Sequence, residues 1–194
     1  MLFLEMDAPL RTDDNFQQRV NKDHHIGKSI FEEVNVGMVS QFPVEYMHLI
    51  CLGVTKKMLK AFIKGWRVNG KQIVKFNSKT INEISEYLIL IRKWIPTEFT
   101  RKTRSFDELD RWKATELRLF LLWAHFLLLK NHLSSEYLYH FNTLHCAIRI
   151  LCHETDCIRN NKCANNLLRY FVKESIALYG RHFVIFNVQF NSFG

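Results

Sequence analysis

The sequence has no hydrophobic run long enough to cross a bilayer. Its most apolar stretch, residues 117–129, spans 13 residues and includes Arg118 and His125, whereas a membrane-spanning helix needs about 20 apolar residues. The apolar run at residues 2–4 is too short for an export signal, and no basic segment precedes it. We therefore expect neither a membrane partner nor export from the cell.

Signatures of catalysis are also scarce. Residues 24–29, HHIGKS, contain a single glycine, too few for a phosphate-binding loop. No segment resembles the nucleophile elbow of hydrolases or the local signature of cysteine proteases. Cys152, Cys157 and Cys163 are spaced more widely than the ligands of a zinc knuckle, so we interpret this region as two core thiols and a polar loop. The odd total of five cysteines favours a reducing, intracellular compartment.

What the chain does have is the composition of a folded protein. Hydrophobic residues make up 47% of its 194 residues and charged residues 24%, and it contains 16 Phe and 4 Trp. This composition excludes a disordered polar tail as the main content of the chain, and the length suits one hydrophobic core, alone or with an extended arm. Lys and Arg outnumber Asp and Glu by 27 to 19, a formal charge of +8. Anionic partners are therefore favoured over cationic ones, and the charge is compatible with nucleic acid, with an acidic domain of a parent protein, or with no specific partner.

The apolar periodicity predicts a mainly α fold, a single helical domain of about five helices at residues 43–181. Residues 1–42 have little periodicity and predict an extended arm with one short helix after Thr12. Residues 182–194 form a tail whose weak alternation predicts one strand or the start of a further segment. The five expected helices cover residues 44–66, about 80–95, 105–130, about 135–151 and about 164–180.

Particular residues fix the expected helix ends and faces. Met47, Cys51, Val54, Met58 and Phe62 recur every three or four residues, as on one face of a helix. Two capping boxes, Thr80 with Glu83 and Ser105 with Glu108, predict helix starts, and Pro96 predicts a helix end. The helix that begins at Ser105 is apolar all round in its second half, so we expect it at the centre of the fold.

Glu45 and His48 are the candidate metal ligands. They lie three residues apart in the first turn of the expected helix, so both side chains project from the same side. Two ligands are half a zinc site, because zinc takes four ligands and a catalytic zinc at least three from the protein. The alternative is an ordinary polar helix start.

The candidate DNA contacts are basic residues. Lys56, Lys57, Lys60 and Lys64 line one side of the first helix opposite its apolar face, and Arg67 and Lys71 follow. A second group, Arg101, Lys102 and Arg104, lies in a loop. Both groups are suited to contacts with the DNA backbone. The alternative is the charged, solvent-facing side that many helices have.

Several long words in the sequence resemble transposases of CACTA/EnSpm-type DNA transposons, in the branch found in animal genomes. The words are residues 8–13 (APLRTD), His24-His25, residues 42–54 (FPVEYMHLICLGV), residues 95–99 (IPTEF) and residues 110–116 (DRWKATE). They occur in the family's order, and the resemblance runs from Ala8 to about Asn187.

The resemblance implies a parent enzyme that cuts and joins DNA. Its active site would hold two divalent metals, Mg²⁺, on three carboxylates of an RNase H-like sheet. In that family the second catalytic Asp precedes the segment that corresponds to residues 8–13, and the final Glu follows the region that corresponds to Asn187. This chain then corresponds to the arm and helical insertion between those acids, and no catalytic carboxylate carries over to it. The resemblance also implies a nuclear location, and contact with the rest of the parent transposase or with a second copy.

The resemblance further implies that Glu45 and His48 are half of a zinc site in the parent. The family has Asp where this chain has Glu45, and its downstream Asn-Val-His corresponds to Asn187, Val188 and Gln189. Glutamine is a poor zinc ligand. We expect no cofactor in this chain alone. We expect a structural role for Glu116, the acidic residue at the end of the segment 110–116.

We therefore interpret the chain as a catalytically incomplete transposase fragment with a scaffolding or DNA-backbone-contact role. One alternative is part of an active, metal-dependent transposase, if the true product is longer. A second alternative is a co-opted module that binds DNA or protein.

Overall fold

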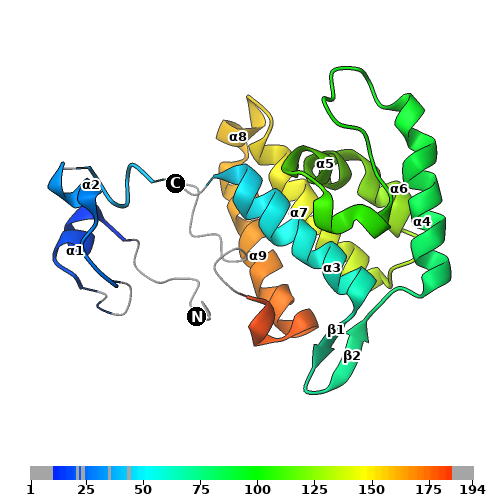
Figure 1. Cartoon of the computed structure of the whole chain (residues 1–194), viewed down its shortest axis with the longest axis horizontal. Helices are drawn as coiled ribbons and strands as arrows, with labels where there is room; N and C mark the ends of the chain where they lie inside the picture. Colours follow the sequence, from blue (N-terminus) through cyan, green and yellow to red (C-terminus); the bar gives the residue numbers. More distant parts are fainter. Residues whose placement is uncertain (1–10, 21, 23–24, 35, 43–44, 185–194) are drawn as a thin grey trace. The chain divides into compact units, whose positions relative to one another are not determined.

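The computed structural model describes residues 11–20, 22, 25–34, 36–42 and 45–184. The chain divides into a smaller unit within residues 7–45 and a larger unit whose described part is residues 46–184. Most of the described residues are helical, which confirms the expected mainly α class (Figure 1). No described helix is long and apolar enough to span a membrane.

The smaller unit contains two short helices, α1 (Asp13–Gln17) and α2 (Ile30–Glu33). The Thr12 side chain accepts a hydrogen bond from the Asn15 N–H and caps α1, as the sequence predicts. The Asp13 carboxylate accepts hydrogen bonds from the backbone of residues 39 and 40. These contacts join α1 to residues 39 and 40, which are distant in sequence. The sequence predicted an extended arm here, without such contacts.

The larger unit begins with a continuous helical segment that becomes tighter along its length. Met47–Thr55 (η2) is π-helical, and Lys56–Lys64 (α3) is α-helical. Cys51, Val54, Met58 and Phe62 are buried, so the predicted apolar face is confirmed. The expected start at residue 44 lies outside the described residues.

A β-hairpin that the sequence reasoning missed follows α3. Strand β1 (Trp66–Val68) pairs antiparallel with β2 (Lys71–Val74). Between the strands, Asn69 and Gly70 have φ of 49° and 79°. Positive φ at both central residues defines the type I′ turn, for which Asn-Gly is a preferred sequence.

The next helix, α4 (Ser78–Leu90), continues as a 3₁₀ turn, η3 (Ile91–Trp94). Its N-cap is Asn77, whose side chain accepts a hydrogen bond of 2.8 Å from the Thr80 N–H. The predicted capping box at Thr80 and Glu83 is therefore wrong, because Asn77 satisfies the first turn three residues earlier. The predicted stop before Pro96 is confirmed.

The expected long helix from Ser105 to Lys130 is broken. A 3₁₀ helix, η4 (Phe106–Arg111), ends at Trp112, which is extended with ψ of 134°. Three consecutive segments then follow: α5 (Ala114–Leu119), the π-helical η5 (Phe120–Ala124) and α6 (His125–Leu129).

This broken helix is not enclosed on all sides. Trp123, Phe126 and Leu127 are about half exposed or more, at 57%, 49% and 66%. The expectation of a fully central helix was wrong, because neighbouring helices cover only one side of it. The other side forms part of the surface.

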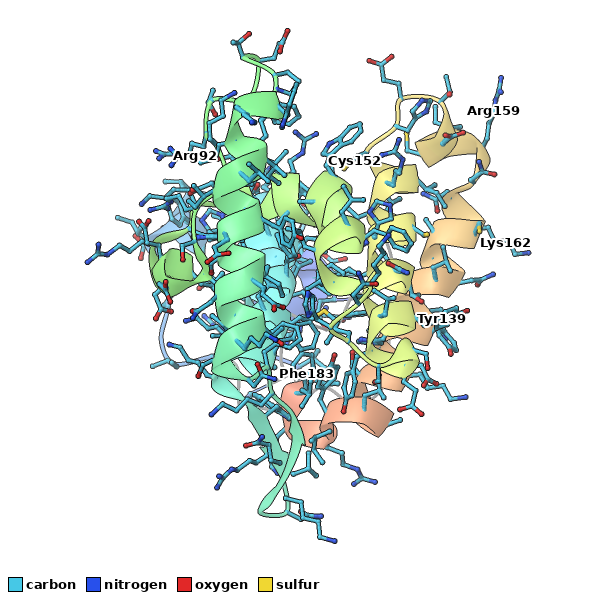
Figure 2. The ribbon with its side chains drawn as sticks, turned by 90° about the vertical axis from the view of Figure 1, so that its right-hand side faces the viewer. Arg92, Tyr139, Cys152, Arg159, Lys162 and Phe183 are labelled. Carbon is cyan, nitrogen blue, oxygen red and sulfur yellow. The ribbon has the colours of Figure 1, made fainter. Side chains whose placement is uncertain are left out.

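The last helices are α7 (Ser135–Leu151), α8 (Asp156–Arg159) and α9 (Asn161–Tyr179), followed by the 3₁₀ turn η6 (Arg181–Phe183). Helices α7 and α9 pack side by side (Figure 1, Figure 2). Cys152 and Cys163 are exposed and Cys157 is half-buried, so they are not core thiols. Of the expected tail, residues 185–194 lie outside the described residues.

Aromatic side chains make up much of the core. Phe62 contacts the rings of Phe76, Tyr137 and Phe141, with centroids 5.7–6.4 Å apart. These rings come from α3, from the segment after β2 and from α7. The core therefore holds α3 and the base of the hairpin against α7.

Candidate nucleic-acid interface

The positive charge of the chain resides in the helical unit. Residues 46–184 contain 23 Lys and Arg against 11 Asp and Glu, a net charge of +12. Residues 7–45 contain four basic and seven acidic residues, a net charge of −3. The balance of the whole chain, +8, therefore understates the field around the helical unit.

Within the helical unit, residues 46–82 contain no acidic residue at all. The basic residues of this segment are Lys56, Lys57, Lys60, Lys64, Arg67, Lys71, Lys75 and Lys79. They lie on α3, on the hairpin and at the start of α4. Because no acid lies among them in sequence, any neutralising partner must come from another element.

One such partner is Asp110, at the end of η4. Its carboxylate is 2.7 Å from Lys60 Nζ and 2.9 Å from Lys64 Nζ, and its carbonyl accepts a hydrogen bond from Lys56 Nζ. The hydrogen bonds from Lys60 and Lys64 lower the pKa of Asp110 to about 2. The Asp110 carboxylate thus pairs with two ammonium groups and its backbone carbonyl with a third, so these three lysines keep an excess of positive charge at the surface.

Lys57 differs from its neighbours because it points inward. Its Nζ donates a hydrogen bond of 2.6 Å to the Phe183 carbonyl and lies 4.5 Å from the Phe183 ring centroid. Burial lowers the pKa of Lys57 to about 8. The structure therefore uses Lys57 to join α3 to η6.

Two members of the predicted loop group are also engaged within the chain. Lys102 Nζ donates to the carbonyls of Ile95 and Pro96. Arg104 forms two hydrogen bonds with the Glu116 carboxylate, at 2.6 and 2.8 Å, and Glu116 is only 2% exposed. Glu116 thus has the structural role expected for it. The third member, Arg101, is exposed and has no ion-pair partner among the described residues.

The hairpin and the residue after it carry exposed basic residues, of which the sequence analysis named Arg67 and Lys71 but not Lys75. Arg67, Lys71 and Lys75 are all exposed, and within the described part of the chain none of them forms an ion pair. The Asn69-Gly70 turn is the signal that predicts such a hairpin.

The predicted metal ligands are both at the surface. Glu45 is exposed just before the helical segment, and His48 is exposed in the first turn of η2. Each has an interaction within the chain. The described residues include no group of three or more His, Cys, Asp or Glu side chains that could hold a metal ion. Because residues 187–189 lie outside the described residues, the zinc half-site stays a prediction.

Comparison of the chain with protein-family models, with curated proteins and with solved structures finds no match.

Proposed function

We propose that the chain is the helical insertion of a CACTA/EnSpm-type transposase and that its helical unit contacts the DNA backbone. The sequence words described above support the family. The observation that carries the DNA role is the acid-free segment 46–82, with its eight basic residues on α3, the hairpin and the start of α4. Phosphate contacts require surplus cations at the surface, and both α3 and the hairpin supply them.

In this proposal the basic residues have different roles. Lys60 and Lys64, with side chains 42% and 61% exposed, share one carboxylate and remain accessible to phosphate. Lys57, Lys102 and Arg104 hold the fold together, which positions the exposed cations. The catalytic carboxylates and Mg²⁺ belong to the rest of the parent transposase. The chain thus acts as a scaffold that presents basic residues to DNA.

DNA binding by the full chain is expected to depend steeply on salt. With about four phosphate contacts, the dissociation constant should rise about 100-fold between 50 and 200 mM NaCl. Fluorescence anisotropy of a labelled duplex across this range measures the slope. A flat salt dependence, or no binding at 50 mM, would rule out the proposed contact with the backbone.

The Lys60→Gln, Lys64→Gln double variant is expected to reduce the slope of log affinity against log salt by about 1.8. The fold should tolerate the change, because Asp110 is 58% exposed and surface ion pairs stabilise proteins little. The matched control is Lys162→Gln with Lys173→Gln, which removes two exposed lysines of α9. Equal losses of slope in the two double variants would show that α3 is not the contact surface.

A further inference from the structure

The β1–β2 hairpin projects from one end of the helical unit. Figure 1 and Figure 2 show it beyond the ends of the surrounding helices in two perpendicular views. The protruding part consists of two strands of three and four residues joined by a tight turn. It therefore presents a narrow two-stranded ribbon to any partner on that side.

The base of the hairpin is fixed to the end of α9 and to η6. The Trp66 indole N–H donates a hydrogen bond of 2.7 Å to the Tyr179 carbonyl. The Trp66 ring meets the labelled Phe183 edge to face, with centroids 5.2 Å apart (Figure 2). Lys57 donates to the Phe183 carbonyl, as described above. The direction in which the hairpin projects is therefore set by the fold.

Gly180 makes this close packing possible. Its φ is +78°, and a Cβ at this position would lie 3.2 Å from a methyl carbon of Val68 in β1. A side chain would be both strained and crowded there. Glycine thus allows the chain after α9 to contact the first strand directly.

The register of the strands places two particular side chains together. Arg67 is paired with Gln72, and both are exposed, whereas Trp66 and Val74 form the half-buried pair nearer the body. The register shifts between Trp66 and Arg67, so Ile73 is an additional residue on β2. Cross-strand partners lie on the same face of a ribbon. Arg67 and Gln72 are therefore adjacent and both accessible to solvent.

These two residue types have a common chemical property. Arginine forms a pair of hydrogen bonds with the major-groove edge of guanine, and glutamine does so with adenine. Lys71 precedes Gln72 beside the turn, Lys75 follows β2 at the base of the hairpin, and both carry single charges suited to phosphates. The hairpin therefore combines side chains that recognise bases with side chains that contact the backbone.

The shape and composition of the ribbon favour duplex over single-stranded nucleic acid. Single strands are bound by exposed aromatic rings on which bases stack. The one aromatic residue of the two strands, Trp66, is half-buried against Phe183. The major groove of B-form DNA admits a two-stranded β-ribbon, whereas the major groove of A-form RNA is too narrow and deep for side chains to read.

We propose that the β1–β2 hairpin enters the major groove of duplex DNA, with Arg67 and Gln72 at base edges and Lys71 and Lys75 on phosphates. This inference rests on the proposed DNA-binding function and adds sequence recognition to it. It assigns the hairpin a partner of defined chemistry, B-form duplex DNA. Arg67, expected from the sequence to contact the backbone, becomes a base contact.

The test begins with selection of duplexes from a randomised pool by the full chain. The enriched sequence is then measured against an unrelated duplex for the unchanged chain and for two variants, Arg67→Lys and Gln72→Ala. Each variant should lose about 5- to 150-fold in affinity for the enriched sequence. The affinity for the unrelated duplex and the salt slope should stay unchanged, because neither variant alters the number of charges.

Lys71→Gln provides the comparison. It should weaken binding to both duplexes equally and reduce the salt slope by about 0.9. An A-form RNA duplex of the enriched sequence should bind no better than an unrelated one. All four proteins are compared by circular dichroism, and the exposed positions of the substitutions should leave the helical signal unchanged.

The outcomes separate this inference from the proposed function. Salt-dependent binding without any enriched sequence, or with enrichment that both Arg67→Lys and Gln72→Ala retain, would overturn the hairpin's role and leave backbone contact standing. Equal recognition of the RNA duplex would overturn it too. Absence of binding to any duplex would overturn the proposed function itself.

Discussion

The free energy of unfolding of the chain is expected to fall by about 5 kcal/mol as the pH is lowered from 6.5 to 4. The cause is a pair of buried histidines, His125 and His140, which are 2% and 1% exposed. Burial lowers the pKa of each from 6.5 to about 4. Between these values the unfolded chain binds two protons that the folded chain does not, so acid favours unfolding.

The surroundings of His140 explain why its ring stays neutral. Its Nε2 is 3.0 Å from the Phe171 carbonyl oxygen, which identifies Nε2 as the donor. The remaining nitrogen, Nδ1, is buried and has no hydrogen-bond partner among the described residues. A proton added at Nδ1 would place a charged donor in apolar surroundings. His125 is held in a comparable way, with Nε2 3.0 Å from Oδ1 of Asn142.

Urea unfolding at a series of pH values measures this effect, and His140→Gln isolates one histidine. The glutamine amide can donate to the Phe171 carbonyl but does not titrate, so the average slope between pH 6.5 and 4 should decrease by about 1 kcal/mol per pH unit. The exposed His182, replaced by glutamine, is the matched control. An unchanged slope in His140→Gln would show that the proton is taken up elsewhere.

A separate loss of stability is expected in stronger acid. Hydrogen bonds from Lys60 and Lys64 lower the pKa of Asp110 from 3.8 to about 2. The stabilisation from this contact is complete above pH 3.8 and disappears as the pH falls to about 2. The two windows do not overlap, so the histidine effect can be measured before the Asp110 contact is lost.

Helix faces could be predicted from the sequence because burial follows the period of the helix. Cys51, Val54, Met58 and Phe62 are spaced to face one side, and all four are buried. The helix end before Pro96 was equally predictable, since proline limits the residues before it. Local rules of this kind gave the mainly α class and the approximate place of each long helix.

Competition between local signals explains the errors. Thr80 and Glu83 have the spacing of a capping box, but Asn77 is also a good N-cap and begins α4 earlier. The strands of the hairpin have only three and four residues and no clear alternation, so the Asn69-Gly70 turn was their main signal. Trp112 interrupts a segment whose apolar pattern alone predicts one long helix.

The chemistry of the candidate interface depended on contacts between distant parts of the sequence. Lys57, Lys60 and Lys64 are spaced three and four residues apart and look equivalent in the sequence, yet Lys60 and Lys64 contact Asp110 whereas Lys57 contacts Phe183. Asp110 is 46 residues from Lys64, and Phe183 is 126 residues from Lys57. No local pattern predicts which lysine points inward. The sequence therefore identified the basic segment but not its division into structural and exposed residues.

Arg104→Ala is expected to lower the free energy of unfolding by about 3 kcal/mol, because it leaves the Glu116 carboxylate buried without its cation. Arg104 Nε and one terminal nitrogen contact the two oxygens of Glu116 at 2.6 and 2.8 Å. Glu116 also accepts a hydrogen bond of 2.7 Å from the Lys113 N–H at the start of α5. The Arg104 side chain is 24% exposed, so solvent can reach the site and the loss lies at the low end for buried pairs.

The matched control uses the second carboxylate that Arg104 contacts. Glu108 lies 3.1 Å from the same guanidinium but is 44% exposed, so Glu108→Gln should cost less than about 1 kcal/mol. Urea unfolding compares the two variants with the unchanged chain. If Arg104→Ala were no more destabilising than Glu108→Gln, the contact with Glu116 would not stabilise the fold.

The same variant separates the two roles considered for Arg104. A residue that holds Glu116 lowers stability when replaced but leaves the salt slope of DNA binding unchanged, provided that binding is measured where the chain is folded. A residue that contacts phosphate lowers the slope by about 0.9 and leaves stability nearly unchanged. Both guanidinium nitrogens that face Glu116 are already engaged, and Arg104 also donates hydrogen bonds to Glu108 and to the Arg111 carbonyl. We therefore expect the stability loss without the change in slope.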